Sequence, residues 1–401
     1  MPQQVGLPGG EAAWKRIVME KKHIVIWKLL RPLVGAFLRL KFGYRYEMAD
    51  GLPENYLVLA NHNTDFDPLF VAASFRRQMY FVASEHIARW PRAYRLIQFA
   101  FAPIVRYKGT VAATTVMEML RTLRRGGNVC MFAEGARSWD GVTAPILAST
   151  GKVVKSAGCG LVTYKLEGGY FVSPNWSQQG TRRGRICGHV VNCYTAEQLA
   201  ALSVEEINRI ITDDLHEDAY ARQLADPAPY RGKQLAYKME NLLFCCPRCG
   251  RIDTMRSGGD TVDCTGCDLQ FRYNVYGMLE GLEQKTVQEL FAWEKNRVLE
   301  IAADGGVFTA PSGRLVSVRR HQETLAAEGP VRMDRQTLRC GGLEIPLEEI
   351  SDMAMHGRQA LVFSAGKVYY ELVPETNALK FHLLYQAYRY GTMVHYSGRL
   401  R

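Results

Sequence analysis

Short apolar runs alternate with longer amphipathic stretches through the first half of the chain. The runs with the length and composition of buried strands cover residues 56–60, 79–84, 129–132 and 161–164. Residues 67–73, 87–102 and 110–125 place apolar side chains at helical spacing, and the last of these stretches ends at Gly126-Gly127, a common helix stop. Strands that alternate with helices predict an α/β domain with a mostly parallel sheet, whose ligands bind at the carboxyl ends of the strands.

The second half of the chain follows a different pattern. Helical spacing covers residues 204–223 and, after a break, residues 283–301. From Gly305 onward, short apolar runs are separated by turns, and a last helix is expected over residues 376–390. The expected strands include residues 315–318, 360–363 and 368–373. Strands followed by one helix predict a small α+β domain, similar in order to the pleckstrin-homology and GRAM-like folds.

Residues 21–39 form a long apolar segment that contains Lys28, Arg31 and Pro32. Each of the two cations would cost roughly 2.5–3.5 kcal/mol at the centre of a bilayer. The favourable transfer of the apolar residues only offsets this cost, so it leaves no net gain for a membrane-spanning position. We therefore expect the segment to lie in the membrane interface rather than to span the membrane. Residues 1–45 carry nine Lys and Arg against two Glu, which suits an anionic leaflet. The alternative is an amphipathic helix docked on the protein core.

The composition is that of a globular protein with more than one domain: 401 residues, of which 47% are hydrophobic and 22% charged. The predicted division is a basic membrane-surface segment (1–45), the α/β domain (46–240), a metal-binding ribbon (241–276), a helical connector (277–304) and the small β-rich domain (305–401). The net charge of +10 fits nucleic acid, a membrane surface or an acidic carrier protein. No signal peptide is visible at the N-terminus, so we expect a peripheral protein on the cytoplasmic face of a membrane.

Four of the ten cysteines form two C-x-x-C pairs, Cys246 with Cys249 and Cys264 with Cys267. Fourteen residues separate the pairs, a spacing typical of a zinc ribbon in a reducing compartment. Four thiolates close the coordination shell, so we expect a structural zinc. Cys245 is an adjacent thiol that confuses the choice of ligands, and four unmetallated thiols are the alternative.

The loop after the first apolar run reads NHNTDFD over residues 61–67. His62 beside a carboxylate can act as a general base, because the carboxylate orients the ring and stabilises the imidazolium that forms. Asp65 and Asp67 both lie within its reach. An Asn- and Asp-rich turn that caps the following helix is the alternative interpretation.

Two further loops follow apolar runs of the same kind. Residues 103–108 predict a strand that carries Arg106, and the run at 129–132 leads into Glu134, Gly135 and Arg137. Two arginines that converge from separate strands suit a phosphate or carboxylate on the substrate. Gly135 permits close approach of the backbone. Surface salt bridges for the arginines, and helix capping for Glu134, remain open.

The sequence GARSW over residues 135–139 lacks the G-x-S-x-G pattern of a serine nucleophile, so the base most simply activates a substrate hydroxyl. The NHx4D motif that starts at Asn61 and the FAEGARS motif over residues 132–138 resemble those of the glycerolipid, or lysophospholipid, acyltransferase family. The second motif matches that family's F-P-E-G-T-R-S at five of seven places. Glu134 lies 72 positions after His62, a normal spacing for the family. The resemblance covers roughly residues 45–215.

The resemblance implies transfer of an acyl group from acyl-CoA or acyl carrier protein to a lysophospholipid hydroxyl in phospholipid biosynthesis. The expected acceptor is 1-acylglycerol-3-phosphate. His62 would deprotonate the hydroxyl, which attacks the thioester directly without an acyl-enzyme, and Asp67 would orient His62. The residues matched to binding of the acceptor's glycerol phosphate are Arg106, Glu134, Gly135 and Arg137.

Two departures from the family pattern leave the acceptor open: Ala133 stands where the family has Pro, and Ala136 where it has Thr. The same fold acting on another lysolipid or an amino-lipid is therefore an alternative. A second is a non-catalytic zinc-ribbon protein that binds nucleic acid or a protein partner. Nucleic acid is not expected, because acidic residues accompany the basic ones in the ribbon and the positive surplus lies beside apolar residues near the N-terminus.

Overall fold

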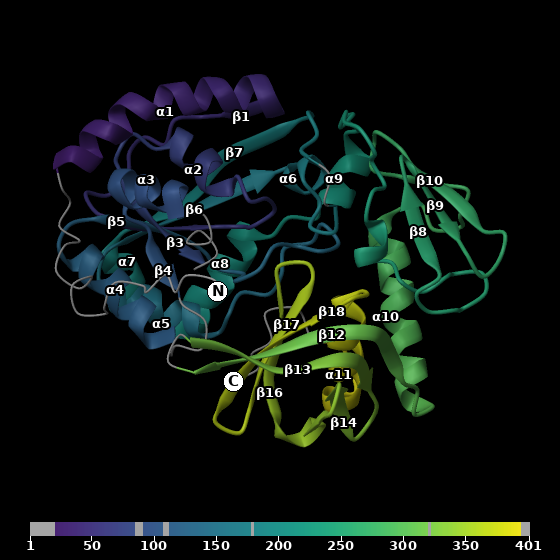
Figure 1. The fold of residues 1–401 in the computed structure, drawn as a ribbon. Helices are drawn as coiled ribbons and strands as arrows, with labels where there is room; N and C mark the ends of the chain where they lie inside the picture. The colour runs from purple at the N-terminus through teal and green to yellow at the C-terminus, as the bar shows by residue number, and fades with distance from the viewer. Residues whose placement is uncertain (1–20, 85–90, 107–111, 178–179, 320–321, 394–401) are drawn as a thin grey trace.

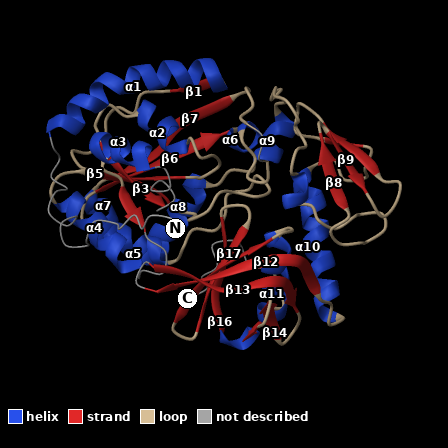
Figure 2. Cartoon of the chain, in the orientation of Figure 1, coloured by secondary structure: helices blue, strands red, loops and turns tan. Residues whose placement is uncertain are grey.

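The computed structural model describes residues 21–84, 91–106, 112–177, 180–319 and 322–393. These residues contain two seven-stranded sheets and one four-stranded sheet. Figure 1 shows the first sheet surrounded by helices, with the two later sheets on the other side of the molecule and the long helix α10 (Val287–Ala303) beside them. Figure 2 shows how the helices gather around the first sheet, whereas strands dominate the C-terminal part.

The first sheet has the strand order β1-β7-β6-β2-β5-β3-β4. Its strands are β1 (Tyr44–Tyr46), β2 (Tyr56–Ala60), β3 (Met79–Ser84), β4 (Ile104–Arg106), β5 (Asn128–Phe132), β6 (Gly160–Glu167) and β7 (Ile186–Tyr194). Neighbouring strands are parallel except β6 and β7. The mostly parallel α/β sheet is therefore confirmed. All residues of β2 are buried, which explains why this central strand reads as a continuous apolar run.

The helices of this part are α1 (Lys21–Phe42), α2 (Asp67–Ser74), α3 (Pro91–Phe101), α4 (Ala112–Arg124), α5 (Ser149–Ala157), α6 (Gly169–Val172), α7 (Ala196–Ala201), α8 (Val204–Leu215) and α9 (Ala219–Ala225). The single helix expected over residues 204–223 is wrong: the chain breaks at His216 and restarts at α9. Asp218 caps the new helix by accepting from the backbone N–H groups of Tyr220 and Ala221. Residues 87–90 of one expected helix, residues 107–108 of one expected strand and residues 110–111 of another expected helix lie outside the described residues.

The four-stranded sheet is antiparallel, with the order β11-β10-β9-β8. Its strands are β8 (Met255–Gly258), β9 (Thr261–Cys264), β10 (Gln270–Tyr273) and β11 (Leu279–Glu280), preceded by the short helix η3 (Met239–Asn241). The cysteine pairs lie in the loop before β8 and at the end of β9. This sheet packs at the far side of the molecule from α1 to α5 (Figure 1).

The C-terminal sheet is antiparallel throughout, with the order β15-β14-β13-β12-β18-β17-β16. Its elements are β12 (Phe308–Arg319), β13 (Gln322–Met333), β14 (Thr337–Cys340), β15 (Leu343–Pro346), η4 (Leu347–Glu349), β16 (Ile350–His356), β17 (Ala360–Ala365), β18 (Val368–Pro374) and α11 (Ala378–Tyr390). The expected series of strands followed by one helix is present. Its likeness to the pleckstrin-homology and GRAM-like folds, and the exact domain boundaries, stay predictions.

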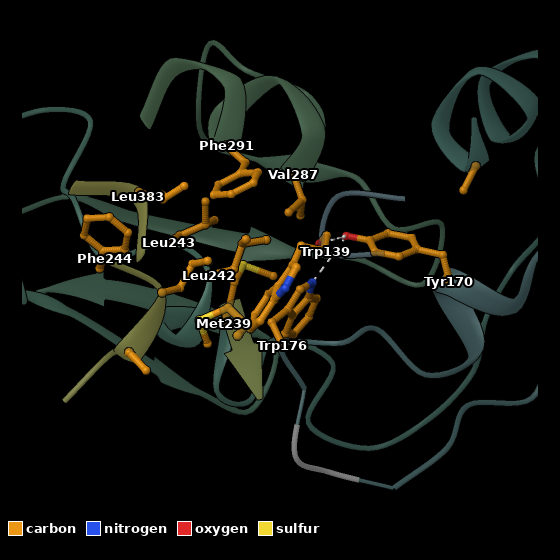
Figure 3. Close-up of a cluster of buried hydrophobic side chains, with 14 of the residues drawn as sticks. Trp139, Tyr170, Trp176, Met239, Leu242, Leu243, Phe244, Val287, Phe291 and Leu383 are labelled. Atoms are coloured by element: carbon orange, nitrogen blue, oxygen red, sulfur yellow. Dashed lines mark hydrogen bonds between the residues drawn. The ribbon is translucent and has the colours of Figure 1, made fainter. Parts of the chain in front are cut away.

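One hydrophobic cluster connects all three parts of the molecule. Figure 3 shows Trp139 and Trp176 from the α/β part packed near Met239 and Leu242, with Phe291 of α10 close by. Each of these side chains is at most 1% exposed. This junction packs the α/β part against η3 and α10, and the same cluster continues without a break into the C-terminal sheet.

Helix α1 has two apolar faces. One face, including Trp27 and Leu38, is buried against the α/β part. The other exposes a row of apolar side chains, namely Val25, Leu29, Leu33, Phe37 and Leu40. Within the described ranges, none of the helices combines the length and hydropathy that crossing a membrane requires.

Candidate active site

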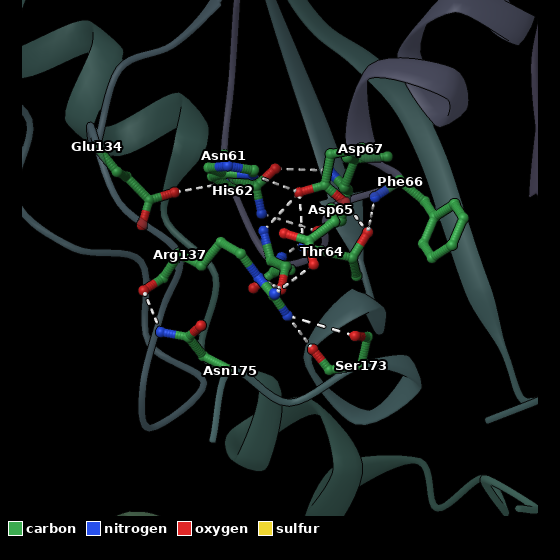
Figure 4. A network of polar contacts seen from close by, with 12 residues as sticks. Asn61, His62, Thr64, Asp65, Phe66, Asp67, Glu134, Arg137, Ser173 and Asn175 are labelled. Atoms are coloured by element: carbon green, nitrogen blue, oxygen red, sulfur yellow. Dashed lines mark hydrogen bonds and ion pairs between the residues drawn. The ribbon is translucent and has the colours of Figure 1, made fainter. Parts of the chain in front are cut away.

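His62 lies just beyond the carboxyl end of β2 and pairs with Asp67. The Nδ1 atom of His62 is 2.9 Å from Oδ2 of Asp67 (Figure 4). The imidazole stacks on Phe132 at the end of β5, with 4.4 Å between ring centroids and 21° between planes. The His62 side chain is 22% exposed, whereas the Asp67 side chain is fully buried. With Nδ1 engaged, Nε2 is the nitrogen left to exchange a proton with a substrate.

Asp67 is held by its own loop. Its Oδ2 accepts hydrogen bonds from the backbone N–H groups of Asn63 (2.6 Å) and Thr64 (2.8 Å). The Thr64 hydroxyl donates to Oδ1 at 2.6 Å. Asp67 is also the first residue of α2, followed by Pro68, which favours a helix start. The loop thus fixes the carboxylate that orients His62, and Asp65 takes no part in that pair.

Glu134 joins the loop after β5 to the backbone of His62. Its Oε1 accepts from the His62 N–H (2.6 Å) and its Oε2 from the Ala144 N–H (2.7 Å). Neither donor begins a helix, so Glu134 is not a helix cap. Burial raises the pKa of this carboxyl to about 8, while the two N–H bonds act in the opposite direction. The sequence points to Glu134 as a residue of the acceptor site; its two hydrogen bonds instead show a carboxyl group that supports the backbone of His62.

Arg137 is buried and reaches several groups. Its Nε donates to the Asn63 carbonyl oxygen at 2.9 Å, and a terminal nitrogen donates to the Ser173 carbonyl oxygen. Its other terminal nitrogen lies 3.1 Å from Oδ2 of Asp65, a side chain that is 69% exposed. Arg137 thus does form an ion pair with the exposed Asp65, but its own guanidinium is buried rather than on the surface. Acceptor binding by Arg137 stays a prediction.

The two remaining predicted site residues lie at the same edge of the sheet. Gly135 has φ +73°, in the left-handed region, and an added Cβ would meet nothing within 4 Å. Arg106 is exposed at the end of β4. Strands β5 and β3 separate β4 from β2, which places Arg106 about 14 Å from the end of β2 at ordinary strand spacing. Gly135 thus lies in the same loop as Glu134 and Arg137. Arg106 lies farther away, on β4, the strand at one edge of the sheet.

Sequence reasoning missed the anchors of the His62 loop. The Asn61 amide donates to the Leu166 carbonyl at 2.8 Å and accepts from the Leu166 N–H at 2.7 Å, which ties the loop to β6. The Ser138 N–H donates to the His62 carbonyl at 3.1 Å. The one signal in the sequence for these anchors was Asn61, a polar residue directly after an apolar run and directly before the predicted base. Nothing in the sequence indicated the contact between Arg137 and Ser173.

The sulfur atoms of Cys246, Cys249, Cys264 and Cys267 all lie within 4.8 Å of one another. The Cys246–Cys267 and Cys249–Cys264 sulfur pairs are 3.7 and 3.8 Å apart. A tetrahedron with zinc–sulfur bonds of about 2.3 Å has edges of about 3.8 Å, so the four thiols fit a zinc ion. Backbone N–H groups of Cys249 and Gly266 point at cluster sulfurs (3.5 and 3.3 Å), as in metal knuckles. Cys245 is outside this cluster.

Fold and site together define an α/β domain with a His–Asp base and a buried arginine at the carboxyl edge of its sheet. Residues 44–167 match the family model described as Acyltransferase. That segment contains the loops of His62, Glu134 and Arg137, and the match supports an acyltransferase domain there.

A similar solved structure is the crystal structure of the 1-acyl-sn-glycerophosphate (LPA) acyltransferase, PlsC, from Thermotoga maritima. It has 16% sequence identity and a TM-score of 0.42, with 54% of this chain and 86% of that chain covered. This likeness is too distant to assign roles to individual residues. The comparison with curated proteins found no match.

Proposed function

We propose that the protein is an O-acyltransferase that moves a fatty acyl group from acyl-CoA or acyl carrier protein to a lysophospholipid hydroxyl. The expected acceptor is 1-acylglycerol-3-phosphate. The observation that carries this proposal is the 2.9 Å pair of His62 with the buried, fully bonded Asp67. Within the described residues, no serine or cysteine is hydrogen-bonded to the His62 ring. The acyltransferase match over residues 44–167 supports the reaction class.

In the proposed reaction, Nε2 of His62 takes the proton of the acceptor hydroxyl as its oxygen attacks the thioester carbonyl. The resulting tetrahedral oxyanion re-forms the carbonyl as the carbon–sulfur bond breaks, and the thiol of the donor leaves with the proton from His62. Asp67 stabilises the imidazolium between these steps. No acyl-enzyme forms, because the substrate oxygen is itself the nucleophile.

Binding of the acceptor's phosphate is assigned to the edge that holds Arg137, with Gly135 allowing close approach and Arg106 adding positive charge. Guanidinium groups pair with phosphate through two parallel hydrogen bonds, which fixes both position and orientation. Ala133 and Ala136, which replace the Pro and Thr of the resembling motif, leave a second candidate acceptor open, another lysolipid or an amino-lipid.

We also propose that α1 lies on an anionic membrane surface. Leu29 (66% exposed), Leu33 (67%) and Leu40 (76%) present apolar area on its outer face. Leu96 of α3 (67% exposed) adds to the apolar residues in this part of the chain. Lysine and arginine residues along α1 would meet anionic headgroups while its apolar row enters the acyl boundary. This position would bring the acceptor lipid to the site without a membrane-spanning segment.

We assign a structural zinc to the four-cysteine cluster. Four thiolates fill a tetrahedral shell, so the ion has no open position for a substrate. Its contribution is to hold the small sheet together, and all steps of acyl transfer belong to the α/β part.

The test offers labelled acyl-CoA and acyl carrier protein, each with a panel of lysolipids, to the purified protein and to a His62→Ala variant. We expect turnover by the wild type and a loss of at least 10³-fold in the variant. His216→Ala, at the exposed end of α8, is the matched control. Equal turnover by wild type and His62→Ala would contradict the mechanism. Absence of turnover with every acceptor would favour a binding protein.

A further inference from the structure

The turn between β16 and β17 brings Arg358 from the C-terminal sheet to the candidate active site. In Figure 1 this hairpin points from the C-terminal sheet toward the α/β part. Nε of Arg358 donates to the carbonyl oxygen of Asn175, and the Asn175 amide donates to the carbonyl oxygen of Arg137 at 3.5 Å. The Arg358 side chain is 26% exposed. An arginine from a separate part of the chain therefore contacts the loops that hold Arg137.

Arg358 and Arg137 share one carboxylate oxygen. Oδ2 of Asp65 lies 3.1 Å from a terminal nitrogen of Arg137 and 3.6 Å from a terminal nitrogen of Arg358. Two guanidinium groups carry two positive charges, and Asp65 supplies only one negative charge. Burial and the nearby charge of Arg137 lower the pKa of Arg358, whereas Asp65 raises it. The site thus has an uncompensated positive charge in partly desolvated surroundings.

The carboxylate between the two arginines is weakly held by its surroundings. Asp65 is 69% exposed, and it lies in the loop between the buried residues Thr64 and Asp67. An exposed side chain can rotate into solvent without uncovering a buried apolar group. A phosphate monoester carries up to two negative charges and three acceptor oxygens, so it matches two guanidinium groups better than one carboxylate does.

We propose that Arg358 and Arg137 together bind the phosphate of the acceptor, and that Asp65 occupies this position until the phosphate displaces it. The proposal rests on the acyl transfer proposed above and assigns part of its acceptor specificity to the C-terminal sheet. Arg358 binds the acceptor and takes no part in the proton transfer at His62. Its loss therefore raises KM for phosphorylated acceptors and leaves kcat unchanged.

The kinetic test compares lysophosphatidate with a monoacylglycerol of the same acyl chain. Arg358→Gln should raise KM for lysophosphatidate about tenfold or more, with kcat and the kinetics of the neutral acceptor unchanged. Arg358→Lys should restore part of the affinity. Arg339→Gln is the matched control, since Arg339 lies on the same sheet in an exposed ion pair with Glu344. An equal KM for Arg358→Gln and wild type would overturn the proposal.

A binding test separates this proposal from the proposed reaction, because it needs no turnover. Inorganic phosphate is titrated against wild type, Arg358→Gln and Asp65→Asn, with the unfolding temperature and calorimetry as readouts. We expect weaker phosphate binding in Arg358→Gln and tighter binding in Asp65→Asn, which no longer supplies a competing charge. If wild type binds phosphate through Arg358 but transfers no acyl group, the reaction fails and the anion site stands. Equal phosphate affinities in all three proteins would contradict the anion site and leave the proposed acyl transfer untouched.

Discussion

Asp67 accepts hydrogen bonds from one imidazole, two backbone N–H groups and one hydroxyl, so its negative charge has a fixed place. Asp67→Asn keeps the size but puts an NH₂ group where donors already point, and it removes the charge that stabilises the imidazolium. We expect kcat to fall roughly 10³-fold with a smaller change in KM. Steady-state kinetics with the best acceptor measures this, and Asp50→Asn, in an exposed pair with Arg76, is the control. A kcat within threefold of wild type would show that His62 works without Asp67.

Glu134 predicts a pH dependence of stability. Its pKa is about 8 in the folded protein against an ordinary value of 4.5, because burial disfavours the charged form. A carboxyl with a raised pKa contributes stability that is fully present below the unfolded value and is lost as pH rises toward the folded value. The unfolding temperature of wild type relative to Glu134→Gln should therefore fall between about pH 4.5 and pH 8.

The comparison with Glu134→Gln isolates this carboxyl, because the neighbouring Glu217, whose pKa burial raises to about 7, titrates in both proteins. At every pH, Glu134→Gln should also reduce kcat, since an amide cannot accept from both the His62 and Ala144 N–H groups. A difference in unfolding temperature that stays flat across the pH range would contradict the assigned shift.

Single residues were predictable where their partners are close in the chain. His62 and Asp67 are five positions apart in one loop, and the start of α2 fixes Asp67. Contacts between distant segments were not predictable. The bond from Arg358 to Asn175 joins positions 183 apart, and no local pattern marks either residue as part of the site. Such pairings depend on how separate sheets pack.

Helix α1 makes a prediction about the membrane. Leu29→Ser combined with Leu33→Ser removes the centre of its exposed apolar row without touching the buried face. Because each leucine gains about 1.5–3 kcal/mol on full burial, we expect at least a tenfold loss of binding to vesicles that contain anionic lipid. Co-sedimentation at low and high salt measures this. Leu224→Ser combined with Leu325→Ser, at two other exposed leucines, is the control, and binding by the α1 variant equal to that control would contradict the membrane position.

Helices and strands could be predicted from the pattern of apolar residues where they are buried on one face or on all sides. The buried strands β2 and β5 and the helix α4 stood out for this reason. Strand β7 was missed because its residues alternate irregularly between buried, half-buried and exposed positions. The break between α8 and α9 was missed because apolar spacing continues through it, and only the cap at Asp218 marks the new start.

The segment that carries the four-cysteine cluster makes polar contacts with α10 and α11. The N–H groups of Phe244 and Cys245 donate to Oε1 of Glu294 in α10 at 2.8 and 2.6 Å. The buried Lys380 of α11 pairs with Asp253, which follows the first cysteine pair. If the cluster holds zinc as proposed, loss of the metal should therefore loosen α10 and α11. Helix α10 packs against α11, and α11 packs against the C-terminal sheet.

We expect about one zinc per chain in the wild type and markedly less in Cys264→Ser, with Cys193→Ser, at an exposed cysteine of β7, as the control. Hydrogen exchange should rise in α10, in α11 and at the turn that holds Arg358, while the buried strands β2 and β5 keep their protection. KM for the phosphorylated acceptor should then rise in Cys264→Ser as it does in Arg358→Gln, because Asp253 pairs with Lys380 of α11 and α11 packs against β16 and β17, the strands that flank Arg358. Hydrogen exchange that increases only within residues 241–276 would show that the ribbon unfolds independently. The position of Arg358 would then depend on the hydrophobic junction around Trp176, not on the metal.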